Sequence, residues 1–311
     1  MTAVQTVTGP VAHEALGATL AHEHLIVQPP GLEQQYPWLY NGTAVLERLV
    51  AELGEARAAG IGTIVDVTTP DLGRDVALLA AASAASGVRI VAAPGIWVAA
   101  GRWFAAATAE QIAGVFTREL EQGIASTSIR AGVIKVAQNR PPGVDALAER
   151  VLRGAALAAA RTGVPITTHT SPYDVGREQL RVFRDAGVPM QLVAIGHAFT
   201  GDLDYLREVL AAGCYLSVDS FRWRAAEAAP VEQALAALCA EGHAARIMLS
   251  HDHAAAHLQP FLDPARRSPT WFAEVPTAVR ARLAALGVPA SDLDAMLLTA
   301  PAAFLAGTRA K

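Results

Sequence analysis

The segment TLAHEHLIV, residues 19–27, carries two histidines inside an apolar run that is typical of a β-strand. Side chains of a strand alternate between its two faces, so His22 and His24 point to one side and Glu23 to the other. One histidine there would be an ordinary core residue, but a same-face pair is costly to bury without a partner. The segment therefore predicts half of a metal site, and the ends of the other strands become the places to look for the rest.

Beyond this segment, short β-branched runs alternate with stretches of helical periodicity. Runs with strand character lie at residues 19–27, 63–69, 89–97, 132–137, 165–170, 192–198, 215–220 and 246–252. Amphipathic stretches, such as residues 43–60, 109–123 and 144–163, fill most of the gaps. Eight apolar strands that alternate with helices predict a (β/α)8 TIM barrel. A doubly wound open sheet is the alternative, but it needs a G-x-G-x-x-G loop after its first strand, and HEHLIVQPPG is nothing like that.

The composition of the 311 residues fits one large α/β domain over residues 1–311, with 52% hydrophobic residues and a formal net charge of −4. The chain is mildly acidic and has no basic run, so we do not expect a nucleic-acid partner. No apolar run is long enough to span a bilayer. The opening residues lack the pattern of a signal peptide, and Cys214 and Cys239 lack metal-type spacing. We therefore expect a cytoplasmic protein with buried thiols, acting on a small molecule. The segment up to about Gly17 is expected to form a short hairpin at the barrel floor.

Polar residues recur at the carboxyl ends of the predicted strands, where (β/α)8 barrels carry their catalytic groups. The candidates are His22 and His24 of strand one, Lys135 of strand four, His169 of strand five, His197 of strand six and Asp252 of strand eight. Each alone has an ordinary explanation, because a strand-end histidine is often a hydrogen-bonded core residue and an aspartate often caps the next helix. Chance would scatter such residues over both ends of a barrel. Their alignment at one end predicts a metal centre.

Lys135 is the unexpected member of this set, because an ammonium group repels cations. It could be a counter-charge or a surface lysine, yet it lies in the apolar strand GVIKVA, residues 132–137, where burial disfavours the charged form. A neutral amine reacts with carbon dioxide to give a carbamate. That reaction would turn Lys135 into an anionic ligand with two oxygens, able to bridge two metals.

These segments, in this order along the chain, resemble the phosphotriesterase family of the amidohydrolase superfamily. The resemblance is carried by HEH at 22–24, TIVDVTT followed by GRD at 73–75, AAPGIW, IRAGVIKVA, GVPITTHT, AIGH and LSHD. It implies a (β/α)8 barrel, a pair of divalent metals, and hydrolysis of esters such as phosphotriesters and lactones, with amide-hydrolysing relatives. Zinc is the usual metal, with cobalt, manganese or iron as alternatives. The family also suggests a homodimer.

The resemblance also assigns a role to every candidate ligand. It implies that His22, His24 and Asp252 hold the more buried metal, that His169 and His197 hold the more exposed one, and that carbamylated Lys135 and a hydroxide bridge the two. Two cations beside one water lower the pKa of that water toward neutrality, which provides a hydroxide nucleophile. Asp252 faces that hydroxide and can take its proton.

Departures from the family pattern bear on the substrate. Ser220 stands where organophosphate hydrolases of the family place a proton-relaying histidine. Those enzymes also place acidic residues within a few positions after the histidine that matches His197, whereas here the first acid is Asp202. Both departures argue against an outward proton relay, and so favour lactones or carboxylic esters over phosphotriesters. Lactonase relatives often show an Asp-Arg step at the end of strand seven, whereas here Asp219 is followed by Ser220, with Arg222 three positions on.

Three residues are expected to contact substrate: Trp97 at the end of strand three, Arg222, and His253 directly after Asp252. Packing on the barrel rim explains Trp97 equally well, and support of the metal ligands is the favoured alternative for His253. Three functions stay open: a binuclear-metal ester hydrolase, an amide hydrolase of a small N-acyl compound, and a barrel that binds a ligand without turnover. The full set of metal-ligand residues argues against the last.

Overall fold

The computed structural model describes residues 3–97, 104–139, 146–257 and 271–308. Its strands are β1 (Ala3–Thr6), β2 (Gly9–Ala12), β3 (Ala18–Val27), β4 (Ile61–Asp66), β5 (Arg89–Ala92), β6 (Gly95–Ile96), β7 (Ile134–Asn139), β8 (Ile166–Ser171), β9 (Val193–Ile195), β10 (Tyr215–Val218), β11 (Ile247–Leu249) and β12 (Ala254–His257). Its α-helices are α1 (Leu32–Gln35), α2 (Gly42–Ala58), α3 (Val76–Ser86), α4 (Ala109–Glu121), α5 (Ala146–Thr162), α6 (Gly176–Asp185), α7 (Leu203–Ala211), α8 (Ala228–Ala240), α9 (Arg280–Ala285), α10 (Ala290–Asp294) and α11 (Ala300–Ala306). Two π-helices, Val275–Val279 and Ala295–Thr299, run directly into α9 and α11.

The strands from β3 onward form a closed parallel barrel. β3 pairs with β4 and β4 with β5, whereas β6, two residues beyond β5, pairs with β7. β7 to β11 then follow in chain order, each parallel to the one before it. β12 comes shortly after β11 and pairs with β3, which closes the ring. Because β5 with β6 and β11 with β12 each make one interrupted barrel strand, the ring has eight strands, and the predicted (β/α)8 barrel is confirmed.

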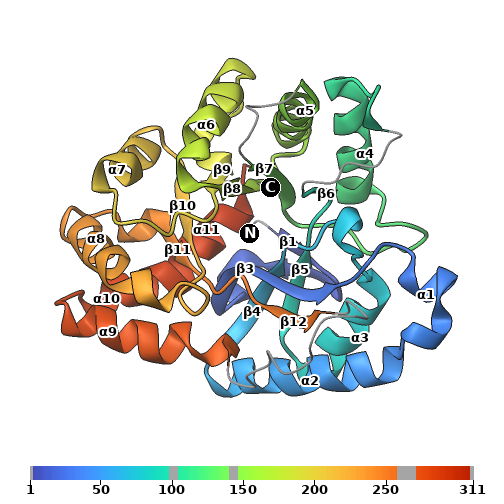
Figure 1. Cartoon of the computed structure of the whole chain (residues 1–311), viewed down its shortest axis with the longest axis horizontal. Helices are drawn as coiled ribbons and strands as arrows, with labels where there is room; N and C mark the ends of the chain where they lie inside the picture. The colour runs from blue at the N-terminus through green and yellow to red at the C-terminus, as the bar shows by residue number, and fades with distance from the viewer. Residues whose placement is uncertain (1–2, 98–103, 140–145, 258–270, 309–311) are drawn as a thin grey trace.

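Helices cover the outside of this ring, as Figure 1 shows in a view along the barrel. Local signals in the sequence account for where they begin. The side chain of Asn41 accepts a hydrogen bond from the third residue of α2, and Thr108 with Gln111 forms a capping box at α4. Apolar faces of the helices pack on the strands in one core, which includes Leu49 of α2 and Phe116 of α4. This packing holds the strand ends in fixed positions.

The amino-terminal end of the barrel is closed by the β1–β2 hairpin and by α11. Val4 of the hairpin and Phe304 of α11 share an apolar cluster with strand residues such as Val65 and Met248. Figure 1 shows α11, in red, near the barrel axis. The predicted hairpin at the barrel floor is confirmed, and the carboxyl ends of the strands are left for a functional site. None of the helices in the described ranges is long and apolar enough to cross a membrane.

Candidate metal centre

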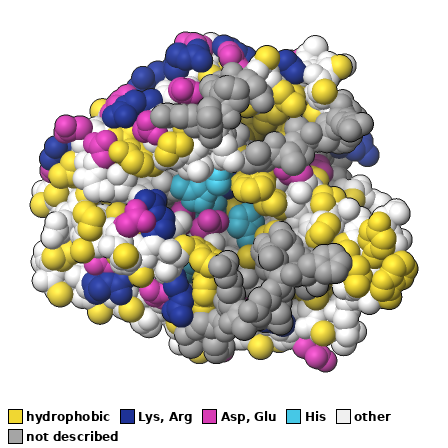
Figure 2. Space-filling model, viewed as in Figure 1, with side chains coloured by type: hydrophobic (Ala, Val, Ile, Leu, Met, Phe, Trp, Pro, Cys, Tyr) yellow, Lys and Arg dark blue, Asp and Glu magenta, His cyan; other side chains and the backbone are white. Residues whose placement is uncertain are grey.

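The six predicted metal ligands meet at the carboxyl ends of the barrel strands. They are His22 and His24 on β3, Lys135 on β7, His169 on β8, His197 after β9, and Asp252 between β11 and β12. Figure 2 shows histidine side chains gathered at the centre of this face, beside acidic atoms. The structure therefore brings together residues that are up to 230 positions apart in the sequence, from His22 to Asp252.

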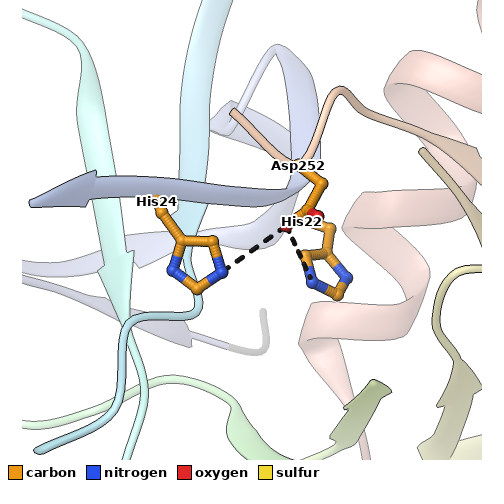
Figure 3. A group of neighbouring side chains, drawn as sticks. All are labelled: His22, His24 and Asp252. Carbon is orange, nitrogen blue, oxygen red and sulfur yellow. Dashed lines mark ion pairs between the residues drawn. The ribbon is translucent and has the colours of Figure 1, made fainter. Parts of the chain in front are cut away.

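Two groups of short distances make up the cluster. The Nε2 atoms of His24 and His22 lie 3.5 and 3.8 Å from Asp252 Oδ1, and both rings turn toward this carboxylate in Figure 3. Lys135 Nζ lies 2.7 Å from the same His22 Nε2. These three residues, His22, His24 and Asp252, place ligand atoms close enough to share one metal ion.

The second group consists of His169 and His197. His197 Nδ1 lies 2.7 Å from Asp219 Oδ1, so this nitrogen donates to the carboxylate and Nε2 is the nitrogen left for a metal. On His169, Nε2 bonds to Asn139 Oδ1 (2.8 Å), while Nδ1 accepts from the Trp97 indole N–H (3.3 Å). The inner nitrogens, His197 Nε2 and His169 Nδ1, lie 2.6 Å apart, the distance of a hydrogen bond with one proton between them. A divalent cation bound by both nitrogens would take the place of that proton.

The tautomer of His24 is set in the same way. The Thr68 hydroxyl donates to Asp66 Oδ1 at 2.7 Å, so its oxygen accepts from His24 Nδ1 at 2.9 Å. His24 Nε2 is left with a lone pair directed toward Asp252. Asp66 Oδ1 also accepts from Leu25 N, so this carboxylate supports the backbone of β3 and, through Thr68, His24. Outer hydrogen bonds of this kind orient metal ligands and raise their basicity.

Burial keeps two of the imidazoles neutral, which is the form that binds metal. The pKa of His22 is lowered well below its ordinary value by burial and by the nearby Lys135. The pKa of His169 is likewise lowered, by burial and by His197. Although burial acts in the opposite direction, the carboxylates of Asp219 and Asp252 raise the pKa of His197.

Burial also disfavours the charged forms of the lysine and the aspartate of the cluster. It lowers the pKa of Lys135 to about 8, despite the opposing effect of Asp252 and Asp219. It raises the pKa of Asp252 to about 7. A divalent cation beside Asp252 would offset the cost of ionising this carboxylate. The tautomers, the lone pairs and the charge balance of the donor set therefore fit divalent metals.

The backbone is strained at this end of the barrel. Among the described residues other than glycine, four have positive φ angles, and three of these are His197 (49°), Ser220 (70°) and Asp252 (56°). Such residues cost of order 1–3 kcal/mol each and persist where the surroundings hold them in place. Two of the three are predicted ligands, which indicates that side-chain direction is fixed here at some cost in stability.

Sequence reasoning gave no role to Asp219, which connects the two groups. Its carboxylate is fully buried; Oδ1 bonds His197 Nδ1 and accepts from the Ser220 hydroxyl (2.8 Å), and Oδ2 is 3.6 Å from His22 Nδ1. Asp219 follows the last residue of β10, so the strand-end rule that selected the other candidates would also have found it. Together with His22 and His197 it forms a second possible ligand group, but its bond to the outer nitrogen of His197 favours a supporting role.

The three predicted substrate contacts lie in different surroundings. Trp97 bonds His169 and so borders the cluster, in agreement with a pocket wall. Arg222 is 40% exposed and its guanidinium stacks 4.8 Å from the ring of Trp271. His253 is buried, packs against Trp271 and bonds Glu52 Oε2 at 3.0 Å. A direct substrate contact by His253 is therefore not supported by its position, because its ring is covered and bonded outside the cluster.

A parallel barrel with converging imidazoles and a carboxylate at the carboxyl ends of its strands defines a class of metal-dependent barrel enzymes. Residues 2–305 match the model of the phosphotriesterase family, and the chain belongs to this family. It is 37% identical over 270 residues to a phosphotriesterase homology protein of Mycobacterium tuberculosis, with 81% of each chain covered. A solved structure of the phosphotriesterase from Mycobacterium tuberculosis matches with a TM-score of 0.87 and 33% identity, covering 97% of this chain and 98% of the other.

Two further relatives differ in the reactions that their names describe. An aryldialkylphosphatase of Saccharolobus solfataricus is 34% identical over 245 residues, with 76% of this chain and 77% of the relative covered. An N-acetyltaurine hydrolase of Rattus norvegicus is 31% identical over 254 residues, with 70% and 71% covered. The family makes this chain a metal-dependent hydrolase of phosphotriesterase type, while the relatives act on different bonds.

Proposed function

We propose that this hydrolase uses two divalent metals to cleave ester bonds, with lactones and carboxylic esters preferred over phosphotriesters. The observation that supports the metal centre best is the convergence of the inner ring nitrogens of His24, His169 and His197. Each of these rings is turned inward by a hydrogen bond on its outer side. Four imidazoles with one carboxylate suit zinc, and also accept cobalt, manganese or iron.

In the proposed centre every predicted ligand has one task. His22, His24 and Asp252 would hold one metal, His169 and His197 would hold the other, and Lys135, as a carbamate, would supply oxygen ligands to both. When bound, such cations supply a water that ionises near neutral pH and a field that polarises the acyl or phosphoryl oxygen of the substrate. The lowered pKa of Lys135 favours this bridge, since only the uncharged amine forms a carbamate.

Asp252 is proposed as the general base. Its side chain is 27% exposed, whereas that of Asp219 is fully buried, so Asp252 is the acid of the cluster that can reach an attacking water. It takes the proton of that water and returns it to the leaving group. Trp97, beside His169, is proposed to border the space for the substrate.

The preference for lactones and esters is supported by where protons can go. The Ser220 hydroxyl donates inward to Asp219, and His253 is bonded to Glu52. In the part of the chain that the structure describes, neither residue offers Asp252 an outward relay. A proton that stays in the pocket suits a lactone, because the alkoxide formed on ring opening remains attached and close by.

An amide hydrolase acting on a small N-acyl compound is the second candidate. The relative named N-acetyltaurine hydrolase favours it. So does the half-exposed guanidinium of Arg222, which could pair with an anionic group at the far end of an N-acyl substrate. Glu274 lies 3.7 Å from this guanidinium and leaves it partly available.

Metal loading tests the proposal directly. Protein purified with zinc and bicarbonate is expected to hold about two metal equivalents per chain. It should hydrolyse a panel of γ- and δ-lactones, aryl acetates, an aryl dialkyl phosphate and N-acetyl amino acids, with an ester or lactone turned over fastest. Chelation should abolish the turnover and added zinc should restore it, while Asp252→Asn provides the control for contaminating esterases. Less than one metal equivalent, or ester turnover that survives chelation, would contradict the proposal.

A further inference from the structure

Glu23 lies between the two predicted ligands of β3 but points to the other face of the strand. Its side chain is fully buried, and it accepts four hydrogen bonds from one short segment, residues 250–253. The bonds to Oε1 come from Ser250 Oγ (2.7 Å), His251 N (2.9 Å) and His251 Nδ1 (2.7 Å), and the bond to Oε2 comes from His253 N (2.9 Å). One carboxylate therefore occupies the donors on both sides of Asp252.

This segment is also where the last barrel strand is interrupted, between β11 and β12. Asp252 has a φ of 56°, a left-handed conformation that costs an aspartate energy. Its own N–H donates to the His22 carbonyl at 3.1 Å. The main-chain N–H groups of His251 and His253, on either side of Asp252, both donate to Glu23. These charge-assisted hydrogen bonds offset the desolvation of the buried Glu23 carboxylate.

We propose that Glu23 is a positioning residue that holds Asp252 in the conformation in which its carboxylate faces His22 and His24. Glu23 acts only through Asp252, since it lies on the opposite face of β3 from the two histidines. The HEH segment thus carries two ligands on one face of the strand and the support for a third on the other.

His251 extends this support toward the carboxyl-terminal part of the chain. Its Nδ1–H donates to Glu23, and its Nε2 accepts from the main-chain N–H of Val275 at 3.0 Å. Val275 opens the π-helix that leads into α9. The position of Asp252 is therefore connected, through Glu23 and His251, to the segment that follows the last barrel strand.

Glu23→Gln is the diagnostic variant, because it keeps the shape of the side chain. The amide oxygen can accept at one position, but the amide NH2 then faces an N–H of the segment, a donor against a donor. Glu232→Gln is the matched control, since Glu232 is also buried and bonds Arg282 between α8 and α9, away from the cluster. Thermal unfolding of both variants separates lost stability from lost positioning.

In Glu23→Gln, we expect zinc affinity and kcat each to fall about 10- to 100-fold, with KM little changed. Zinc affinity is measured by competition with a chelator. Glu232→Gln should keep both within about twofold. The activity measurement rests on the proposed function, whereas zinc affinity does not, so a wild type without turnover would leave the inference testable. A Glu23→Gln protein that loses stability like the control but keeps zinc affinity and kcat would overturn it.

A second pair of variants decides the matter if Glu23→Gln does not fold. His251→Asn keeps a donor toward Glu23, whereas His251→Phe keeps the bulk of the ring and loses the donor. Zinc affinity should be lower in His251→Phe than in His251→Asn by about fivefold, the value of one lost hydrogen bond. Equal affinities in these two variants would show that Glu23 does not position Asp252.

Discussion

Lys135 is fully buried, and its Nζ lies 2.7 Å from the ring nitrogen of His22 that also faces Asp252. An ammonium group at this position would oppose a metal, so the lysine is either modified or structural. If it bridges as a carbamate, Lys135→Ala should lose most of its zinc, and its kcat/KM should fall by at least on the order of 10²-fold. Such a fall would exceed the usual effect of removing a residue that only hydrogen-bonds a metal ligand. Acetate or propionate with zinc should restore part of both, because a small carboxylate fits the space left and supplies two oxygens. Metal analysis and turnover measure this, and full activity in the variant would identify a structural lysine.

At the residue scale, the sequence predicted which side chains meet but not what holds them. The period of two along β3 and the strand-end rule select His22, His24 and Asp252 without a structure. The supporting bonds of Thr68 to His24 and of Glu23 to residues 250–253 join strands that are neighbours in the barrel but far apart in the sequence, and no local pattern in the sequence marks them. His253 was expected near substrate because it follows Asp252, but the neighbouring Glu52 and Trp271 determine where its ring lies.

The segment that follows β10 contacts the predicted base, which follows the neighbouring strand β11. The indole N–H of Trp223 donates to the main-chain carbonyl of Asp252 at 2.9 Å, and its ring packs edge-on against Trp271. Trp223→Phe keeps this packing and removes the donor, so kcat should fall about fivefold, the value of one hydrogen bond, with a small change in KM. Steady-state kinetics on a single lactone would test this, with Trp38→Phe as a control because Trp38 is exposed and packs on Tyr36. Equal kcat in the two variants would contradict a role for the indole N–H.

At the element scale, the interruption of the last barrel strand is a feature that the periodicity of the sequence does not predict. The run 246–252 was predicted as one strand, whereas β11 ends at Leu249 and β12 begins at Ala254. Ser250 N–H still bonds the Val218 carbonyl of β10, but residues 251–253 leave the ladder because Glu23 and the His22 carbonyl take their N–H groups. The helices were predicted more closely, since the amphipathic pattern and the caps of α2 and α4 are local signals.

At the scale of the whole molecule, the closed barrel brings the six predicted ligands from five strand ends to one place and limits the directions in which a proton can leave. Asp219 and Ser220 bond each other below the cluster, and His253 is covered by Trp271. In a phosphotriester enzyme the proton of the nucleophile must be exported while three bulky ester arms are accommodated. In the proposed mechanism, Asp252 would have to return its proton to the leaving group or to water in the pocket.

This restriction predicts the order of substrates. The kcat/KM for the best γ- or δ-lactone should exceed that for an aryl dialkyl phosphate by on the order of 10²-fold or more, the usual contribution of a general acid–base path. A tethered alkoxide accepts the proton from Asp252 without leaving the pocket, whereas a departing phosphoester arm does not. Ser220→His, which introduces a titratable ring beside Asp219, should narrow the ratio by raising the phosphotriester value. Both substrates must be measured on one metal-loaded preparation. A phosphotriester value at or above the best lactone, ester or amide value would overturn the choice of substrate and leave the metal centre untouched.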